Sequence, residues 1–180
     1  MKTTQASEDV PTPSSPKTSP RNRHRARTVA LQVLFQWDFH GQTSVGIQEF
    51  WENQQIAPED AVFAKCLISG VQEKYVELDR LISRHAKNWT IDRMPVVDRN
   101  ILRQSTYELL WIQDVPAKVT LNEALQLAKS FADDEARRFI NGVLNQMLQV
   151  EARLAAKRIH LSLPDVPTTN EPLSHSSEVD

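Results

Sequence analysis

A chain of 180 residues with 40% hydrophobic residues and a net charge of −2 suits one domain or two small packed subdomains. Glycine is scarce, at 4 residues, and helix-forming residues dominate, which disfavours a β-rich fold. No apolar run is long enough to span a membrane, and the N-terminus has no apolar secretory segment. We therefore expect a cytoplasmic protein.

Both ends of the chain are predicted to be disordered. Residues 1–20 and 161–180 are rich in Thr, Ser and Pro and poor in large apolar residues, so burial cannot offset the entropy of ordering them. Residues 21–160 are predicted to form the folded domain. No acid occurs between Val10 and Arg27, and the basic residues there are Lys17, Arg21, Arg23, Arg25 and Arg27. A basic arm on a near-neutral body indicates a local contact with a polyanion.

The first helix is predicted to begin near residues 23–25 and to end near His40, with Gly41 as its stop. Its apolar residues form a wide arc, which indicates burial on more than one side; they are Ala26, Ala30, Leu31, Val33, Leu34, Phe35 and Trp37. Arg25 and Arg27 fall in or next to the first turn, where cations oppose the helix dipole. Either this end is frayed and solvated, or function placed the charges there to bind phosphate.

A short helix over residues 44–55 and a helix opened by Pro58 are expected next, followed by a fourth helix over residues 74–85. Cys66, the only cysteine, sits in an apolar helical context and is predicted to be a buried, inert thiol. Gly70 either allows a close helix approach or divides the segment in two. Trp89 is expected to pack as a lid over the core.

A helix from residue 94 or 95 to about Trp111 is long enough to be central, with Ile101, Leu102 and Leu109 among its apolar residues. For the following helix two starts compete, one at Pro116 and one with Thr120 as N-cap, and we favour the earlier. Its predicted apolar stripe is Leu121, Ala124, Leu125, Ala128 and Phe131.

A short polar loop, residues 132–135, supplies the N-cap and acids for the last helix. The apolar stripe of that helix is Ile140, Val143, Leu144 and Met147. Together the elements predict an all-α fold of about seven helices in two small packed helical subdomains.

No catalytic motif is evident. The sequence has no Gly-rich phosphate loop, no G-x-S-x-G and no H-E-x-x-H. Its five histidines are scattered and only one cysteine is present, which disfavours a zinc site. We therefore expect no enzyme activity, no metal and no cofactor.

Nucleic-acid binding is the chemistry that the basic residues indicate. Arg137 and Arg138 precede Phe139 at the start of the last helix, and an aromatic ring beside arginines suits base stacking with phosphate neutralisation. Helical periodicity alone favours a core position for Phe139. Lys118 and Lys129 on the preceding helix are further candidates.

The segment from Asp114 to Leu144, DVPAKVTLNEALQLAKSFADDEARRFINGVL, resembles the C-terminal signature of the NusB family of transcription antitermination factors. Upstream, ALQVLFQW (residues 30–37), preceded by Arg25 and Arg27, resembles the start of that family. Ile101-Leu102-Arg103 with Tyr107-Glu108-Leu109 resembles its central helix. The resemblance covers roughly residues 21–158.

This resemblance implies a non-catalytic, RNA-binding factor. NusB-like proteins bind boxA, a short single-stranded element of ribosomal RNA leader and antitermination transcripts, with a small-subunit ribosomal protein that doubles as NusE. Together with other Nus factors and RNA polymerase they support processive transcription and ribosomal RNA maturation. The implied RNA contacts are Arg23, Arg25, Arg27, Lys118, Arg138 and Phe139, and the implied partner contacts are Asp98, Arg103 and Tyr107.

The chain departs from the family's pattern at two places. Asp134-Glu135-Ala136 stands where relatives often have Glu-Asp-Ser, and His24 stands where they often have arginine.

An alternative function is that of a module related to the N-terminal domain of ribosomal RNA cytosine methyltransferases, which the lack of a downstream catalytic domain disfavours. Another is a helical dimerisation protein without RNA binding, which the arginines disfavour. A homodimer remains open.

Overall fold

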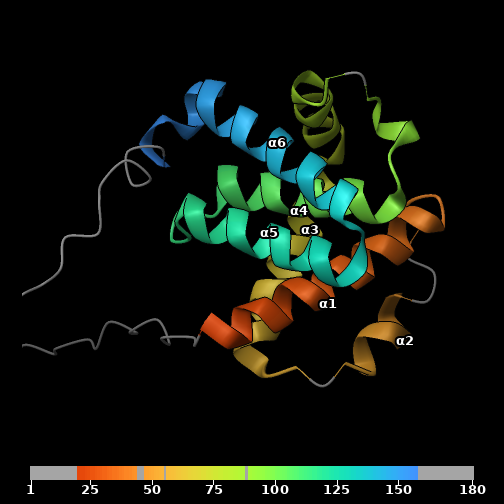
Figure 1. Ribbon diagram of the computed structural model, residues 1–180. Helices are drawn as coiled ribbons and strands as arrows, with labels where there is room; N and C mark the ends of the chain where they lie inside the picture. Colours follow the sequence, from red (N-terminus) through yellow and green to blue (C-terminus); the bar gives the residue numbers. More distant parts are fainter. Residues whose placement is uncertain (1–19, 44–46, 55, 88, 158–180) are drawn as a thin grey trace, which may run out of the picture. The chain divides into compact units, whose positions relative to one another are not determined.

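The computed structural model describes residues 20–43, 47–54, 56–87 and 89–157. In chain order they form α1 (Pro20–Phe39), α2 (Ile47–Glu52), α3 (Pro58–His85), the 3-10 helix η1 (Ile91–Arg93), α4 (Val96–Trp111), α5 (Ala117–Phe131), α6 (Asp134–Val150) and the 3-10 helix η2 (Ala152–Leu154). The α-helices are labelled in Figure 1. These ranges contain no strand, and the predicted all-α class is confirmed.

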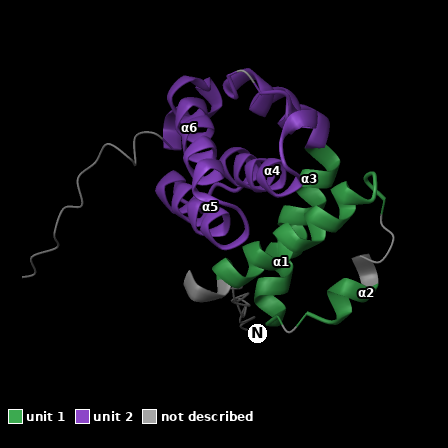
Figure 2. Ribbon diagram, turned by 45° about the vertical axis from the view of Figure 1, so that its right-hand side comes forward, with its two compact units in different colours: residues 1–74 green, residues 75–180 purple. Residues whose placement is uncertain are grey.

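Two compact units divide the chain, residues 1–74 and residues 75–180 (Figure 2). They correspond to the two predicted subdomains. The disorder predicted for residues 1–20 and 161–180 falls outside the described residues, apart from Pro20, which is already the first residue of α1. None of the described helices combines the length and apolar character that crossing a membrane requires.

In the first unit, α1 begins at Pro20, about one turn before its predicted start, and ends at Phe39. Gly41 stops it as predicted: the φ angles of Gly41 and Gln42 are +70° and +65°, a left-handed conformation that ends helices. The Gln42 N–H donates to the Trp37 carbonyl at 2.7 Å. Six of the seven residues predicted to lie on the inner arc of α1 are buried; they are Ala26, Ala30, Leu31, Val33, Leu34 and Trp37. Phe35, the seventh, is only half-buried.

One continuous helix, α3, replaces the two helices predicted between Pro58 and His85. Gly70 lies buried inside it, so the glycine does not divide the segment. The prediction of a buried Cys66 is wrong, because the thiol is exposed. Cys66 follows exposed Val62 by four residues on the outer face of α3, whereas Ala64 and Leu67 point inward.

In the second unit, α4, α5 and α6 pack against one another (Figure 1). The stripe predicted for α6 is confirmed, since all four of its residues are buried. In α5 the earlier start is confirmed, with Pro116 as N-cap. Ala124 and Ala128 are buried as predicted and Leu127 joins them, whereas Phe131, expected inward, is 40% exposed.

Polar side chains are buried along α4 as well as apolar ones. Arg103, 2% exposed, donates a hydrogen bond to each carboxylate oxygen of Asp79 on α3, from Nε to Oδ1 at 2.7 Å and from Nη2 to Oδ2 at 2.8 Å. Thr120 does not cap α5. Its hydroxyl donates to the buried Glu108 carboxylate at 2.7 Å.

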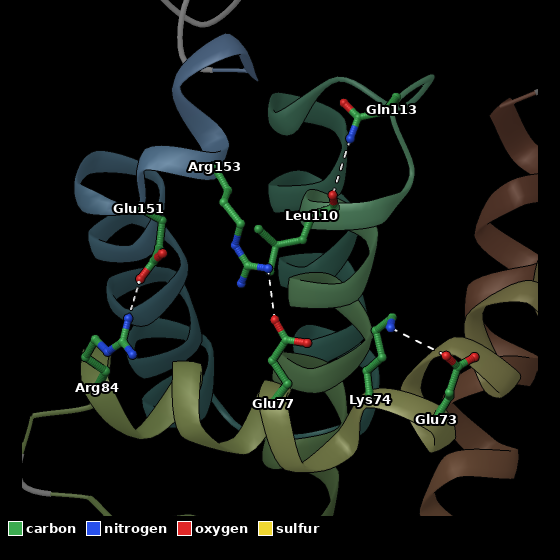
Figure 3. Close-up of polar contacts among 8 residues, drawn as sticks. All are labelled: Glu73, Lys74, Glu77, Arg84, Leu110, Gln113, Glu151 and Arg153. Carbon is green, nitrogen blue, oxygen red and sulfur yellow. Dashed lines mark hydrogen bonds and ion pairs between the residues drawn. The ribbon is translucent and has the colours of Figure 1, made fainter.

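Residues 151–157, which we call the C-terminal strap, are fastened to the second unit by charged contacts (Figure 3). Glu151 accepts a hydrogen bond from Arg84 at 3.1 Å and pairs with His85 at 3.0 Å. Arg153 pairs with Glu77 at 2.9 Å. Lys157 donates to the Ile112 carbonyl at 2.7 Å, satisfying a carbonyl just beyond the end of α4.

Candidate nucleic-acid interface

The three predicted arginines of α1 have different environments. Because α1 starts at Pro20, Arg27 lies two turns inside the helix, not at its first turn. It is only 2% exposed, whereas Arg23 is half-buried and Arg25 is exposed. Arg23 and Arg27, four residues apart, share one face of the helix, and Arg25 points elsewhere. Of the three, Arg25 is the only one that is exposed.

Arg23 and Arg27 both stack on Phe63 of α3, a residue that the sequence reading overlooked. The two guanidinium carbons lie 4.9 Å and 5.1 Å from the ring centroid, within the range of a cation–π contact. Buried Asp60 lies one turn earlier on α3. Burial and neighbouring Glu59 raise the pKa of the Asp60 carboxyl, and the positive charge of Arg23 opposes that rise.

A groove of about 760 Å³ opens in the second unit. It lies between the start of α4, the end of α5 and the start of α6, and Phe131, Arg138 and Phe139 contribute to its lining. Trp89 lines it too, 44% exposed, with its ring centroid 5.7 Å from that of Phe139. Trp89 is therefore not simply a lid over the core.

Phe139 is half-buried, so it is neither a full core residue nor a fully exposed stacking platform. Its contact with Trp89 leaves part of an aromatic surface facing the groove, beside exposed Arg138. Two aromatic rings next to a guanidinium suit a flat base and its phosphate. The sequence signal for this pairing was limited to Phe139 and its arginines, because Trp89 lies far from them along the chain.

Acidic residues also line this groove; they are Asp98, Asp133 and Glu135. Asp98 is buried, and its pKa is raised by burial and by the charge of Asp133. The Asp133 carboxylate accepts a hydrogen bond from the Ala136 N–H at 2.8 Å and so caps α6, as predicted for this loop. Arg137 pairs with Asp134 at 3.1 Å, which leaves Arg138 as the arginine lining the groove.

Lys118 is exposed in the first turn of α5. Phe131, which lines the groove, is the last residue of the same helix, so at 1.5 Å per residue the two are about 20 Å apart. Lys118 is therefore not brought into the groove with Arg138 and Phe139. Lys129 is also exposed, in the last turn of α5.

The three residues of α4 predicted to contact the partner lie in different environments. Asp98 lines the groove, and Arg103 is committed to Asp79 inside the unit. Tyr107 is half-buried and stacks on Trp111, with centroids 5.3 Å apart at 18°; Arg153 covers Trp111 from the strap at 5.4 Å. Tyr107 is the member of the three with an aromatic surface near solvent.

Within the part of the chain that the structure describes, no group of three or more His, Cys, Asp or Glu side chains could hold a metal ion. The exposed cations and the aromatic rings of the two units can bind a polyanion with exposed bases.

Comparison with known proteins identifies the relatives of this chain. Residues 24–149 match the model of the NusB family. The chain is 40% identical over 136 residues to the transcription antitermination protein NusB of Streptomyces avermitilis, covering 73% of this chain and 94% of that protein. It is 42% identical over 125 residues to the Bacillus subtilis protein of the same name, covering 69% and 93%.

Solved structures agree with the sequence comparison. The chain is similar to T. maritima NusB, with a TM-score of 0.65 and 33% identity over 71% of this chain and 91% of that one. It is also similar to a chain of the crystal structure of antitermination factors NusB and NusE in complex with double-stranded RNA. There the TM-score is 0.65 and the identity 32%, over 72% of this chain and 97% of that one.

Proposed function

Because this chain belongs to the NusB family, we propose that it is an RNA-binding transcription antitermination factor that acts with a NusE-like ribosomal protein. The observation that carries the proposal is its similarity, nearly along the whole of that chain, to a protein solved with NusE and RNA. Relatives at about 40% identity carry the antitermination name. The arginines and aromatic rings described above supply a matching chemistry.

The proposed RNA is a boxA-like element of ribosomal RNA transcripts. On the first unit, exposed Arg25 and half-buried Arg23 are the phosphate contacts. On the second unit, Arg138 neutralises phosphate while Phe139, beside Trp89, stacks on a base. Lys118 adds a further phosphate contact at the other end of α5.

The proposed partner contacts on α4 are the Asp98 carboxylate, which lines the groove, and the Tyr107 ring, which lies beside Trp111. Arg103 supports that helix through Asp79. The mechanism is tethering: the protein pair holds the nascent transcript and, with other Nus factors, keeps RNA polymerase resistant to termination and aids ribosomal RNA maturation. This role involves no catalytic step and no cofactor, and we place it in the cytoplasm, with the transcripts on which it acts.

The test is a binding titration with three RNAs: a single strand containing boxA, a scrambled single strand and a duplex. Each is measured across a salt series, with and without the NusE-like protein. We expect the boxA strand to bind most tightly and the partner to strengthen it. Equal, weak binding to all three, unchanged by the partner, would contradict the proposal. The duplex arm matters because the related complex contains double-stranded RNA.

Single substitutions then assign the contacts. Arg25→Ala and Arg138→Ala should each weaken binding to all RNAs and reduce the salt slope by about 1, since each removes one phosphate contact. The matched control is Arg80→Ala, an exposed arginine of α3 outside the proposed contacts, which should leave the slope unchanged. A slope that falls equally for Arg80→Ala would mean that net charge alone governs the binding.

A further inference from the structure

The two arginines that share one ring differ in what they can do. Arg27 is 2% exposed, so its guanidinium cannot reach an RNA phosphate while it stays on Phe63. Arg23 is half-buried and keeps part of its surface in solvent while it lies 4.9 Å from the same ring. The ring thus contacts one buried guanidinium and one that is partly exposed to solvent.

We propose that Phe63 is a positioning residue for RNA recognition, which holds Arg23 in place for a phosphate while Arg27 acts as its buried support. The inference rests on the proposed function and refines it, because it separates the arginines into two that touch RNA and one that does not. Arg23 and Arg25 are the contacts, and Arg27 acts through Phe63 and Arg23.

The physical reason is preorganisation. A free arginine side chain loses rotamer entropy when it is fixed against a phosphate. Arg23 is already held against the negative face of Phe63, so less of that freedom remains to be lost when RNA binds.

Electrostatic interactions also favour phosphate binding at Arg23. Two guanidinium groups four residues apart on one helix face repel each other, and both lie against one ring, at 4.9 Å and 5.1 Å from its centroid. The ring offsets part of the repulsion, and a phosphate bound at Arg23 offsets more. Asp60 lies close enough to Arg23 for that positive charge to oppose the rise in the carboxyl's pKa, so the local field includes one carboxyl group.

The test is a double-mutant cycle on RNA affinity, with a fluorescein-labelled single-stranded boxA RNA as the probe. Phe63→Leu keeps an apolar side chain but removes the ring, and should weaken binding about threefold to tenfold. Phe63→Tyr keeps an aromatic ring at this position and should retain most of the native affinity. In an Arg23→Ala background, Phe63→Leu should cause no further loss, because the side chain that it positions is gone.

Two controls separate positioning from folding. Val62→Ala, at the neighbouring exposed position of α3, should leave affinity unchanged. Arg27→Met should leave the salt slope unchanged, whereas Arg23→Ala should lower it by about 1. Helical circular dichroism and melting temperature are recorded for every variant, so that affinities are compared only among folded proteins.

The outcomes are distinct. If Phe63→Leu weakens binding equally with and without Arg23, or if Arg27→Met lowers the salt slope as Arg23→Ala does, the positioning role is wrong while the RNA-binding function stands. If the unsubstituted chain binds none of the RNAs, the proposed function fails, and the inference fails with it.

Discussion

Replacing Arg103 by Met tests whether this arginine is a structural residue or a partner contact. The substitution keeps an apolar stem of similar length and removes the guanidinium that holds Asp79 at 2.7 Å and 2.8 Å. Removing one member of a buried ion pair costs about 3–5 kcal/mol, because the other charge stays behind without its partner. The Asp79 side chain is 22% exposed, so water recovers part of that loss.

We therefore expect Arg103→Met to lower the free energy of unfolding by about 2–4 kcal/mol, which corresponds to a fall in melting temperature of roughly 10 °C for a folded region of this size. The assay is urea unfolding at 25 °C followed by circular dichroism. Adding Asp79→Leu should restore part of the lost stability, since no stranded carboxylate remains.

The matched control is the pair formed by Arg153 and Glu77, whose side chains are each 47% exposed. Glu77→Ala should cost only about 0.2–1 kcal/mol, as exposed pairs do. If Arg103→Met costs no more than Glu77→Ala, the reasoning from burial is refuted. If it lowers affinity for the NusE-like partner while stability is unchanged, Arg103 is a contact and not a support.

Three further outcomes are expected. Asp133→Ala removes the cap on the Ala136 N–H and should cost about 1 kcal/mol in urea unfolding, whereas Asp133→Ser should cost little. The pKa of the Glu151 carboxyl is lowered, mainly by its hydrogen bond with His85. The ionised carboxylate therefore stabilises the fold above the ordinary glutamate pKa, and this stabilisation is lost as pH falls through the lowered pKa. The difference in unfolding free energy between the native chain and Glu151→Gln should accordingly shrink in acid. Phe139→Ala should weaken RNA binding while costing only about 1–2 kcal/mol of stability, because the ring is half-buried; a larger loss would mark it as core.

Periodicity predicted the elements whose burial is one-sided. The stripe of α6 and the Asp133 cap follow from local pattern and local capping, and both are found. The stop at Gly41 follows likewise from the left-handed conformation that glycine accepts. In these cases the sequence neighbours of a residue carry the physical cause.

Where the cause lies far along the chain, the sequence prediction was wrong or incomplete. Gly70 costs a helix only about 1 kcal/mol, and buried Leu67 and Val71 beside it compensate within continuous α3. The apolar residues around Cys66 in the sequence led to the prediction of a buried thiol, but Cys66 lies on an exposed face of α3. Arg27 is buried because it packs on Phe63. Phe63 lies far from Arg27 along the chain, so the local sequence pattern could not predict that burial.

The exposed position of Cys66 has a practical consequence. It is the only cysteine of the chain, and its thiol is accessible, so a maleimide dye attaches at a single known position on α3 without any substitution. One dye per molecule permits counting of subunits by single-molecule photobleaching, which distinguishes a monomer from a homodimer directly. The same accessibility allows two chains to become crosslinked through a disulfide in air, and sizing experiments therefore require a reductant.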